Sequence, residues 1–84
     1  MANETQIILN EIKKARELYA SNQNTIIIKI NLEKETQKQS YDFIGVFDNE
    51  FDNIEATHNV TTLNEVMKEL LNQDYLLLFE FEEY

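Results

Sequence analysis

The sequence contains no cysteine, no proline and no tryptophan, and it has a single glycine, Gly45. Without cysteine, the chain has neither a disulfide framework nor a thiolate metal site. One glycine is too few for a phosphate-binding glycine loop. Because proline is absent, the turns have to rely on asparagine and aspartate. Disulfide-rich scaffolds, cysteine zinc sites and glycine-loop nucleotide sites are therefore excluded.

Long apolar runs are also missing. No stretch approaches the roughly 18 apolar residues that a membrane-spanning helix needs. The first six residues, MANETQ, lack the basic cluster that opens a secretory signal. We therefore expect no membrane span, no secretory signal and a cytoplasmic location.

Basic residues are few, with 7 Lys and Arg against 16 Asp and Glu, and the formal net charge is −9. Residues 1–42 contain as many bases as acids, so residues 43–84 carry the whole excess, with Lys68 as their one base. Such a field repels nucleic acids and anionic membranes and attracts basic protein surfaces. The alternative interpretation is that the acidity serves solubility alone.

What the sequence does contain is enough for one hydrophobic core. Its 84 residues, 43% of them hydrophobic, predict a single small acidic α+β domain over residues 1–84. This apolar content argues against wholesale disorder.

Two segments have the apolar spacing of helices. Residues 3–21 predict a helix with Asn3 as N-cap and Gln6 completing a capping-box-like pair. Its basic residues fall on the side that we interpret as solvated; they are Lys13, Lys14 and Arg16. Residues 62–72 predict a second helix, opened by a capping box of Thr62 and Glu65.

Four segments have strand patterns, at residues 25–33, 41–47, 51–56 and 75–84. The last of these, YLLLFEFEEY, starts with an unbroken apolar run, which predicts a strand buried on both faces at its start. Gly45 lies inside the second strand and indicates a β-bulge or a close approach by another group.

The element order is therefore α-β-β-β-α-β. We predict a four-stranded, mostly antiparallel sheet of order 3-2-1-4 with both helices on one face and the last strand parallel to the first. Because the first and last strands are the most apolar, we expect both to be central. This arrangement also places Lys29 across from Glu80 or Glu82.

Asp48, Glu50 and Asp52 have the spacing of the first three ligands of a calcium loop. The pattern then fails, because Asn53 stands where the turn needs glycine and Asn59 stands where the bidentate glutamate belongs. An acidic hairpin turn beside an edge strand explains the same residues, since charged edges prevent sheet-to-sheet aggregation. We predict no metal site.

His58 is the only histidine, and nothing in the sequence supplies it with a metal-binding partner. Neither serine, Ser21 or Ser40, lies in a recognisable nucleophile motif. We therefore predict no catalytic residue, no cofactor and no enzyme activity.

The order α-β-β-β-α also occurs in double-stranded RNA-binding domains. Contacts to phosphates need lysine and arginine, and the acidic half of this chain offers only Lys68. We therefore predict no direct binding of nucleic acid.

The acidic half instead predicts a protein-binding surface. Carboxylates spaced along strands and turns can imitate the phosphates of a duplex and bind a basic channel, with electrostatic steering of the encounter. The candidate aromatic anchors are Tyr41, Phe51, Tyr75 and Tyr84, with core or sheet packing as the alternative for each. The predicted partner-binding residues are Asp48, Glu50, Asp52, Glu55, Glu80, Glu82, Glu83 and Tyr84.

In size, composition and charge the chain resembles the small acidic inhibitors of phages and mobile elements, the anti-CRISPR and anti-restriction DNA mimics. The resemblance rests on the short single domain, the lack of Cys and Pro, the richness in Asn, Ile, Lys and Glu, and the acidic half. It implies a non-enzymatic inhibitor that presents an acidic surface to a basic nucleic-acid-binding protein, such as a CRISPR or restriction nuclease.

Two other functions remain open at this point. A homodimeric structural or regulatory accessory protein would pair through a second apolar sheet face, which sequence alternation assigns to Ile27, Ile44, Val46, Leu76 and Leu78. An immunity protein or antitoxin fits the charge equally well.

Overall fold

The computed structural model describes residues 3–19, 24–48 and 50–84. The elements are α1 (Glu4–Tyr19), β1 (Thr25–Leu32), β2 (Gln39–Phe47), β3 (Glu50–Thr57), α2 (Val60–Asn72) and β4 (Leu76–Glu83). This order confirms the predicted α-β-β-β-α-β sequence of elements. The predicted extension of the first helix to residue 21 lies outside the described residues.

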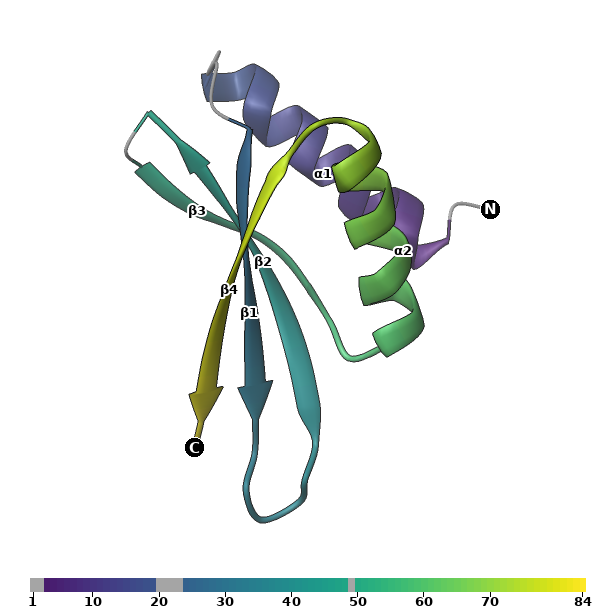
Figure 1. Ribbon diagram of the computed structural model, residues 1–84, viewed down its shortest axis with the longest axis vertical. Helices are drawn as coiled ribbons and strands as arrows, with labels where there is room; N and C mark the ends of the chain where they lie inside the picture. The colour runs from purple at the N-terminus through teal and green to yellow at the C-terminus, as the bar shows by residue number, and fades with distance from the viewer. Residues whose placement is uncertain (1–2, 20–23, 49) are drawn as a thin grey trace.

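The four strands form one sheet of order β3-β2-β1-β4, as predicted. β1 is antiparallel to β2 and parallel to β4, and β3 continues the antiparallel pairing at the far edge of β2. Both helices lie on the same side of this sheet (Figure 1), where α1 contacts β2 and β3 and α2 contacts β4. The fold is therefore α+β with a helix-covered face and an open face.

The core lies between the helices and the sheet. Alternate residues of β1 and β2 face the helices, so Ile26 and Ile28 pack beside Phe43 with no exposed surface. α1 contributes Ile8 and Ile12, and α2 completes the core with Leu63, Val66 and Leu70.

The first residue of each helix is set by an asparagine. The Asn3 side chain accepts a hydrogen bond from the Gln6 backbone N–H at 2.8 Å, which confirms the predicted N-cap. The predicted cap of α2 is wrong, because the Asn59 side chain accepts hydrogen bonds from the backbone N–H groups of Thr61 and Thr62. Asparagine caps at least as well as threonine, so the helix starts at Val60 and Thr62 is buried inside its first turn.

β4 is an edge strand, and the expectation that it is central and buried on both faces is wrong. β1 has β2 on its other side, so β4 has one neighbour only. Leu76 is 59% exposed and Leu78 45% exposed, because both lie on the open face. The apolar run in β4 therefore reflects an exposed apolar edge and not a buried strand.

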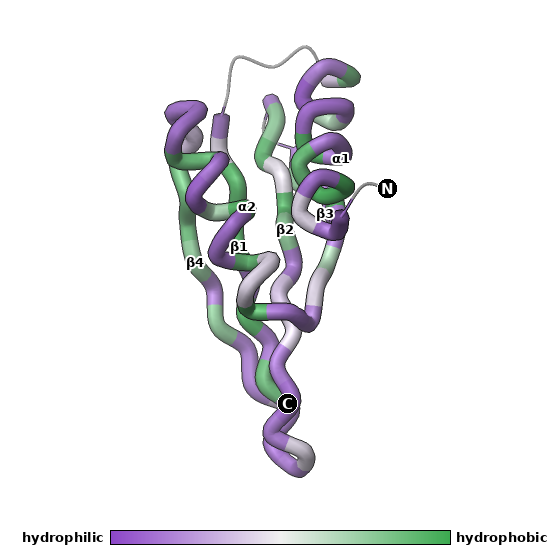
Figure 2. The backbone as a smooth tube through the Cα atoms, turned by 90° about the vertical axis from the view of Figure 1, so that its right-hand side faces the viewer, coloured by the Kyte–Doolittle hydropathy of each residue, from purple (hydrophilic) through white to green (hydrophobic). Residues whose placement is uncertain are grey.

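The sheet is longer than the helices that cover it. The β1–β2 hairpin and the end of β4 extend past α2 (Figure 2). Among the described residues, no helix is long and apolar enough to cross a membrane, as expected.

Gly45 is buried on the helix-covered face of β2, opposite Asp52 of β3. A Cβ atom at this position would overlap the ring of Phe47 and lie 2.8 Å from Cδ1 of Ile54. The β2–β3 register shifts between Phe43 and Ile44, so the strand pairing is irregular beside the glycine. Phe47 cannot move away easily, because it is fully buried and stacks on Tyr19 at 5.5 Å. Of the two alternatives predicted for Gly45, the close approach is confirmed, whereas the irregular pairing lies between Phe43 and Ile44 and Gly45 itself is paired with Asp52.

We predict that Gly45→Ala lowers the free energy of unfolding by about 1–3 kcal/mol, the usual cost of overpacking a core. Urea denaturation followed by circular dichroism measures this change. Ser40→Ala, on the open face of the same strand, is the control and should be near neutral. Equal stability of the two variants would contradict the account of Gly45.

Candidate protein-binding surfaces

The first group of predicted binding residues follows the β2–β3 hairpin. Asp48 has a φ of 51°, a left-handed conformation that aspartate tolerates in turns. Glu50 lies opposite Phe47 and Asp52 opposite Gly45, on the outer strand β3. Glu55 lies opposite Phe43, beyond the register shift. The side chains of Asp48, Glu50 and Glu55 are exposed, and that of Asp52 is half-buried. We call Asp48, Glu50, Asp52 and Glu55 the hairpin acids.

The second group lies at the end of β4. Glu82 forms an ion pair with Lys29 on β1, with a distance of 2.5 Å between Nζ and Oε2. Glu80 lies beside Lys29 in the strand register, as predicted. Tyr84 is 65% exposed, and its backbone is fixed by hydrogen bonds with Leu32 and Lys34. Of the other predicted anchors, Phe51 is exposed, whereas the predictions for Tyr41 and Tyr75 are wrong because both are buried in the core. We call Glu80, Glu82, Glu83 and Tyr84 the β4 group.

The structure does not bring these two groups together. β3 and β4 are the two opposite edges of the sheet. Asp52 is in register with Ile26 through Gly45, whereas Glu82 is in register with Asn31, five residues further along β1. At about 3.3 Å per residue and 4.8 Å per strand, Asp52 and Glu82 are roughly 22 Å apart. The predicted set is therefore two separate acidic groups at diagonal corners of the sheet.

Lys29 is the positive centre of the β4 group. The hydrogen bond and the charge of Glu82 raise the pKa of Lys29 above its ordinary value of 10.5. Partial burial acts in the opposite direction, and Glu80 and Asp42 add smaller upward effects. Asp42 in turn accepts a hydrogen bond from the Asn31 amide at 2.8 Å. This corner of the sheet is thus partly neutralised, unlike the hairpin acids.

The open face divides into an apolar end and a charged end. One row across the strands joins Leu78, Ile27 and Ile44, and the next row towards the β1–β2 hairpin joins Glu80, Lys29 and Asp42. A shallow depression of about 430 Å³ lies over the second row and extends to β3. A protein surface with both apolar and basic side chains would complement this face.

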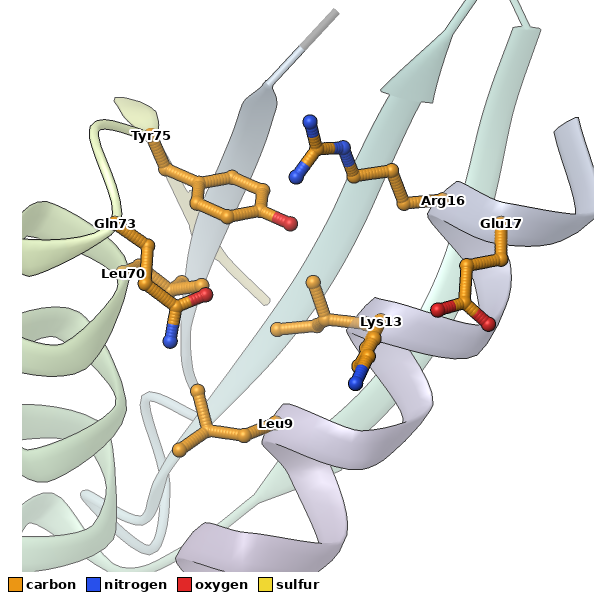
Figure 3. A pocket seen from close by; sticks show the side chains of 8 residues that line it. Leu9, Lys13, Arg16, Glu17, Leu70, Gln73 and Tyr75 are labelled. Atoms are coloured by element: carbon orange, nitrogen blue, oxygen red, sulfur yellow. The ribbon is translucent and has the colours of Figure 1, made fainter. Parts of the chain in front are cut away.

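A cleft of about 520 Å³ lies between α1 and the end of α2. Figure 3 shows Arg16 and Tyr75 facing each other across it, and the guanidinium carbon is 5.8 Å from the ring centre, within cation–π range. Leu9 and Leu70 line its apolar part, and Lys13 lies at its rim. Lys13 and Arg16, two of the three basic residues of α1, line this cleft, whereas Lys14 does not, so the prediction of a solvated face is incomplete for Lys13 and Arg16.

In the described part of the chain, no group of three His, Asp or Glu side chains lies close enough to hold a metal ion. His58 is exposed in the link between β3 and α2. The described residues thus offer exposed surfaces and two clefts between α1 and α2, of about 520 and 450 Å³.

Comparisons with protein-family models, curated proteins and solved structures found no match to this chain.

We predict that Glu82→Gln lowers the pKa of Lys29 and reduces stability in a pH-dependent way. A pKa raised in the folded state contributes stability below the unfolded value of 10.5, and this stability is lost as the pH rises through the folded pKa. The difference in Tm between wild type and variant should thus have its largest value at about pH 8 and decrease above about pH 10.5. Glu83→Gln, which removes a neighbouring carboxylate outside the ion pair, serves as control. A difference that stays constant through the alkaline range would contradict the assignment.

Proposed function

We propose that this protein is a non-enzymatic inhibitor that binds a basic, nucleic-acid-binding protein through an acidic surface. The observation that carries the proposal is the confinement of the net charge of −9 to residues 43–84. Carboxylates in such a surface stand in for backbone phosphates and compete with nucleic acid for the same cationic channel. A CRISPR or restriction nuclease is the kind of target that this chemistry fits.

The hairpin acids are the better candidate for the main contact. Within the described ranges 3–19, 24–48 and 50–84, none of them forms an ion pair, whereas Glu82 in the β4 group is paired with Lys29. An unpaired exposed carboxylate keeps its full charge available to a partner and has no internal ion pair to break on binding. The hairpin also places its acids along an outer strand and its turn, where another protein can reach them.

Phe51 adds an apolar contact to the hairpin acids. It is 70% exposed and lies opposite Val46, between Glu50 and Asp52 in the sequence. Because side chains alternate along a strand, Phe51 lies on the open face with Val46, whereas Glu50 and Asp52 lie on the helix-covered face. A basic partner that wraps around the β3 edge, with an apolar pocket for Phe51, would contact the aromatic ring and the carboxylates together.

The test is the triple variant Asp48→Lys, Glu50→Lys and Asp52→Lys. We expect it to remain folded and to lose binding to the basic target, with an association rate at least about tenfold lower because steering is reversed. Binding is measured by pull-down from host lysate at about 0.1 M and 1 M salt, between which the screening length falls from about 10 to 3 Å. Mass spectrometry identifies the proteins retained at low salt only.

A matched control separates the position of the charges from their sum. Glu17→Lys, Glu35→Lys and Glu69→Lys make the same change in net charge at exposed positions away from the β2–β3 hairpin. We expect this control to retain most of the binding. If the hairpin variant bound the same proteins with unchanged salt dependence, the proposal would be wrong.

The second candidate function is a homodimeric accessory protein that pairs through the open face. Its support is the exposure of Leu76 and Leu78 beside Ile27 and Ile44 on that face. An immunity protein or antitoxin is a third candidate with the same charge. Identification of the retained partner as a nuclease, a toxin or a second copy distinguishes the three functions.

A further inference from the structure

Among the described residues, no strand pairs with the outer edge of β4. The backbone N–H of Leu76 donates to Asn24 and that of Tyr84 donates to Leu32, so even-numbered residues of β4 direct their hydrogen-bonding groups toward β1. Because these directions alternate along a strand, Leu77, Phe79, Phe81 and Glu83 direct theirs outward. The two edges of the sheet differ in this respect, because charged side chains and a register shift protect β3.

The side chains beside this edge are apolar and exposed. Leu77, Phe79 and Phe81 lie on the helix-covered face, in register with Ile26, Ile28 and Ile30. Phe79 is nevertheless 55% exposed and Phe81 63% exposed. A long, apolar and unprotected edge strand is a ready template for pairing with another strand.

α2 adds a second apolar element next to the same edge. Val60, Met67 and Leu71 are spaced by seven and four residues, so they share one side of the helix, which we call the α2 flank. Val60 is 53% exposed and Leu71 is 57% exposed. The flank faces away from α1, because α1 meets α2 on the opposite side, where Thr5 donates a hydrogen bond to Glu65.

We propose that a second copy of this chain binds at this edge, with the two β4 strands paired antiparallel about a two-fold axis at Phe79. In this register Phe79 pairs with Phe79 of the second copy, and Leu77 pairs with Phe81. These are the residues with outward-facing backbone groups, so each pair can exchange two hydrogen bonds. The helix-covered side of the junction then becomes a continuous apolar row, with the two α2 flanks on the same side.

The charges on β4 favour this register. Glu80 falls opposite Leu78 of the second copy and Glu82 opposite Leu76, so no carboxylate on the paired strands directly opposes another. A two-fold axis at Glu80 would instead place Glu80 opposite itself, and like charges directly opposite each other are destabilising. The strand is thus complementary to its own reversed copy, which argues for a second copy as the occupant.

The exposed apolar side chains at this edge supply part of the area that a stable dimer buries. A phenyl side chain presents about 150–250 Å² when free, so Phe79 and Phe81 alone expose roughly 200 Å². The α2 flank, Leu76, Leu78 and the strand backbone add to this area, towards the roughly 800 Å² per partner of a standard interface. This inference does not depend on the proposed function, because the hairpin acids lie on the opposite edge.

Sedimentation equilibrium tests the dimer. We expect a concentration-dependent approach to twice the chain mass of 10.0 kDa for the wild type. Phe79→Glu should raise the dissociation constant at least about a hundredfold, whereas Phe51→Glu, a matched aromatic change on the β3 edge, should leave it within about threefold. A wild-type chain that stays monomeric to millimolar concentration would overturn the proposal. So would equal effects of the two variants.

Single cysteines test the register, since the wild type has none. A Phe79→Cys chain should form a disulfide dimer under mild oxidation, because paired Cα atoms about 5.5 Å apart lie within the disulfide range. Leu77→Cys should not, because its own copies would be four residues apart, or about 13 Å. The double variant Leu77→Cys with Phe81→Cys should again crosslink. Disulfide dimers of the Leu77→Cys chain without dimers of the Phe79→Cys chain would overturn the register. If the dimer formed through the open face, neither the Phe79→Cys chain nor the double variant would crosslink, and the β4 edge would be ruled out.

Discussion

Hydrogen bonding on both sides of β1 holds this structure together. β1 is antiparallel to β2 and parallel to β4, so it joins the N-terminal meander to the last strand of the chain. Its residues Ile26 and Ile28 reach the core under the helices, while Ile27 is buried on the open face by its neighbours. The order of the sheet follows from this double pairing, because β3 and β4 are then left as the two edges.

The two edge strands, β3 and β4, differ in how well they are protected against pairing with another strand. β3 carries Glu50, Asp52 and Glu55 and a shifted register, which together discourage pairing with another strand. β4 has exposed phenylalanines and leucines along most of its length, and its carboxylates are gathered at its end. The acidic edge therefore suits a charged partner, and the apolar edge suits a second strand.

Charge and packing act at different places in this molecule. The described buried residues are apolar or aromatic apart from Gly45, Thr57 and Thr62, and the excess acid lies on strands, turns and helix surfaces where water and salt screen it. The ion pair between Lys29 and Glu82 lies at the β4 corner and reduces the charge there. The hairpin acids form no ion pair within the described residues, so their carboxylates can contact another protein.

Sequence periodicity was sufficient to predict the elements, the strand order and the faces of β1 and β2, because the core positions of helices and strands follow fixed repeats. Periodicity failed for β4, because its apolar run predicts a buried central strand, whereas the strand order 3-2-1-4 itself places the last strand at an edge. The start of α2 was missed because Asn59 and Thr62 are both good caps, and only the backbone geometry decides between them.

Features that depend on the tertiary arrangement could not be predicted from the sequence. The α2 flank could not be predicted, since Val60 lay outside the expected helix. The separation of the two acidic groups follows from the register of strand pairing, which cannot be derived from the composition of residues 43–84. The cleft lined by Arg16 and Tyr75 likewise joins two segments that are distant in the sequence.

The most direct measurement is amide hydrogen exchange along β4 at low and high protein concentration. The account predicts that the amides of Leu78, Glu80 and Glu82, which face β1, are protected at both concentrations. Those of Phe79 and Phe81 should gain protection only at high concentration, when a second strand covers the edge. Protection of neither set would contradict the parallel pairing of β1 and β4, and unprotected outward amides at every concentration would contradict the role given to this edge.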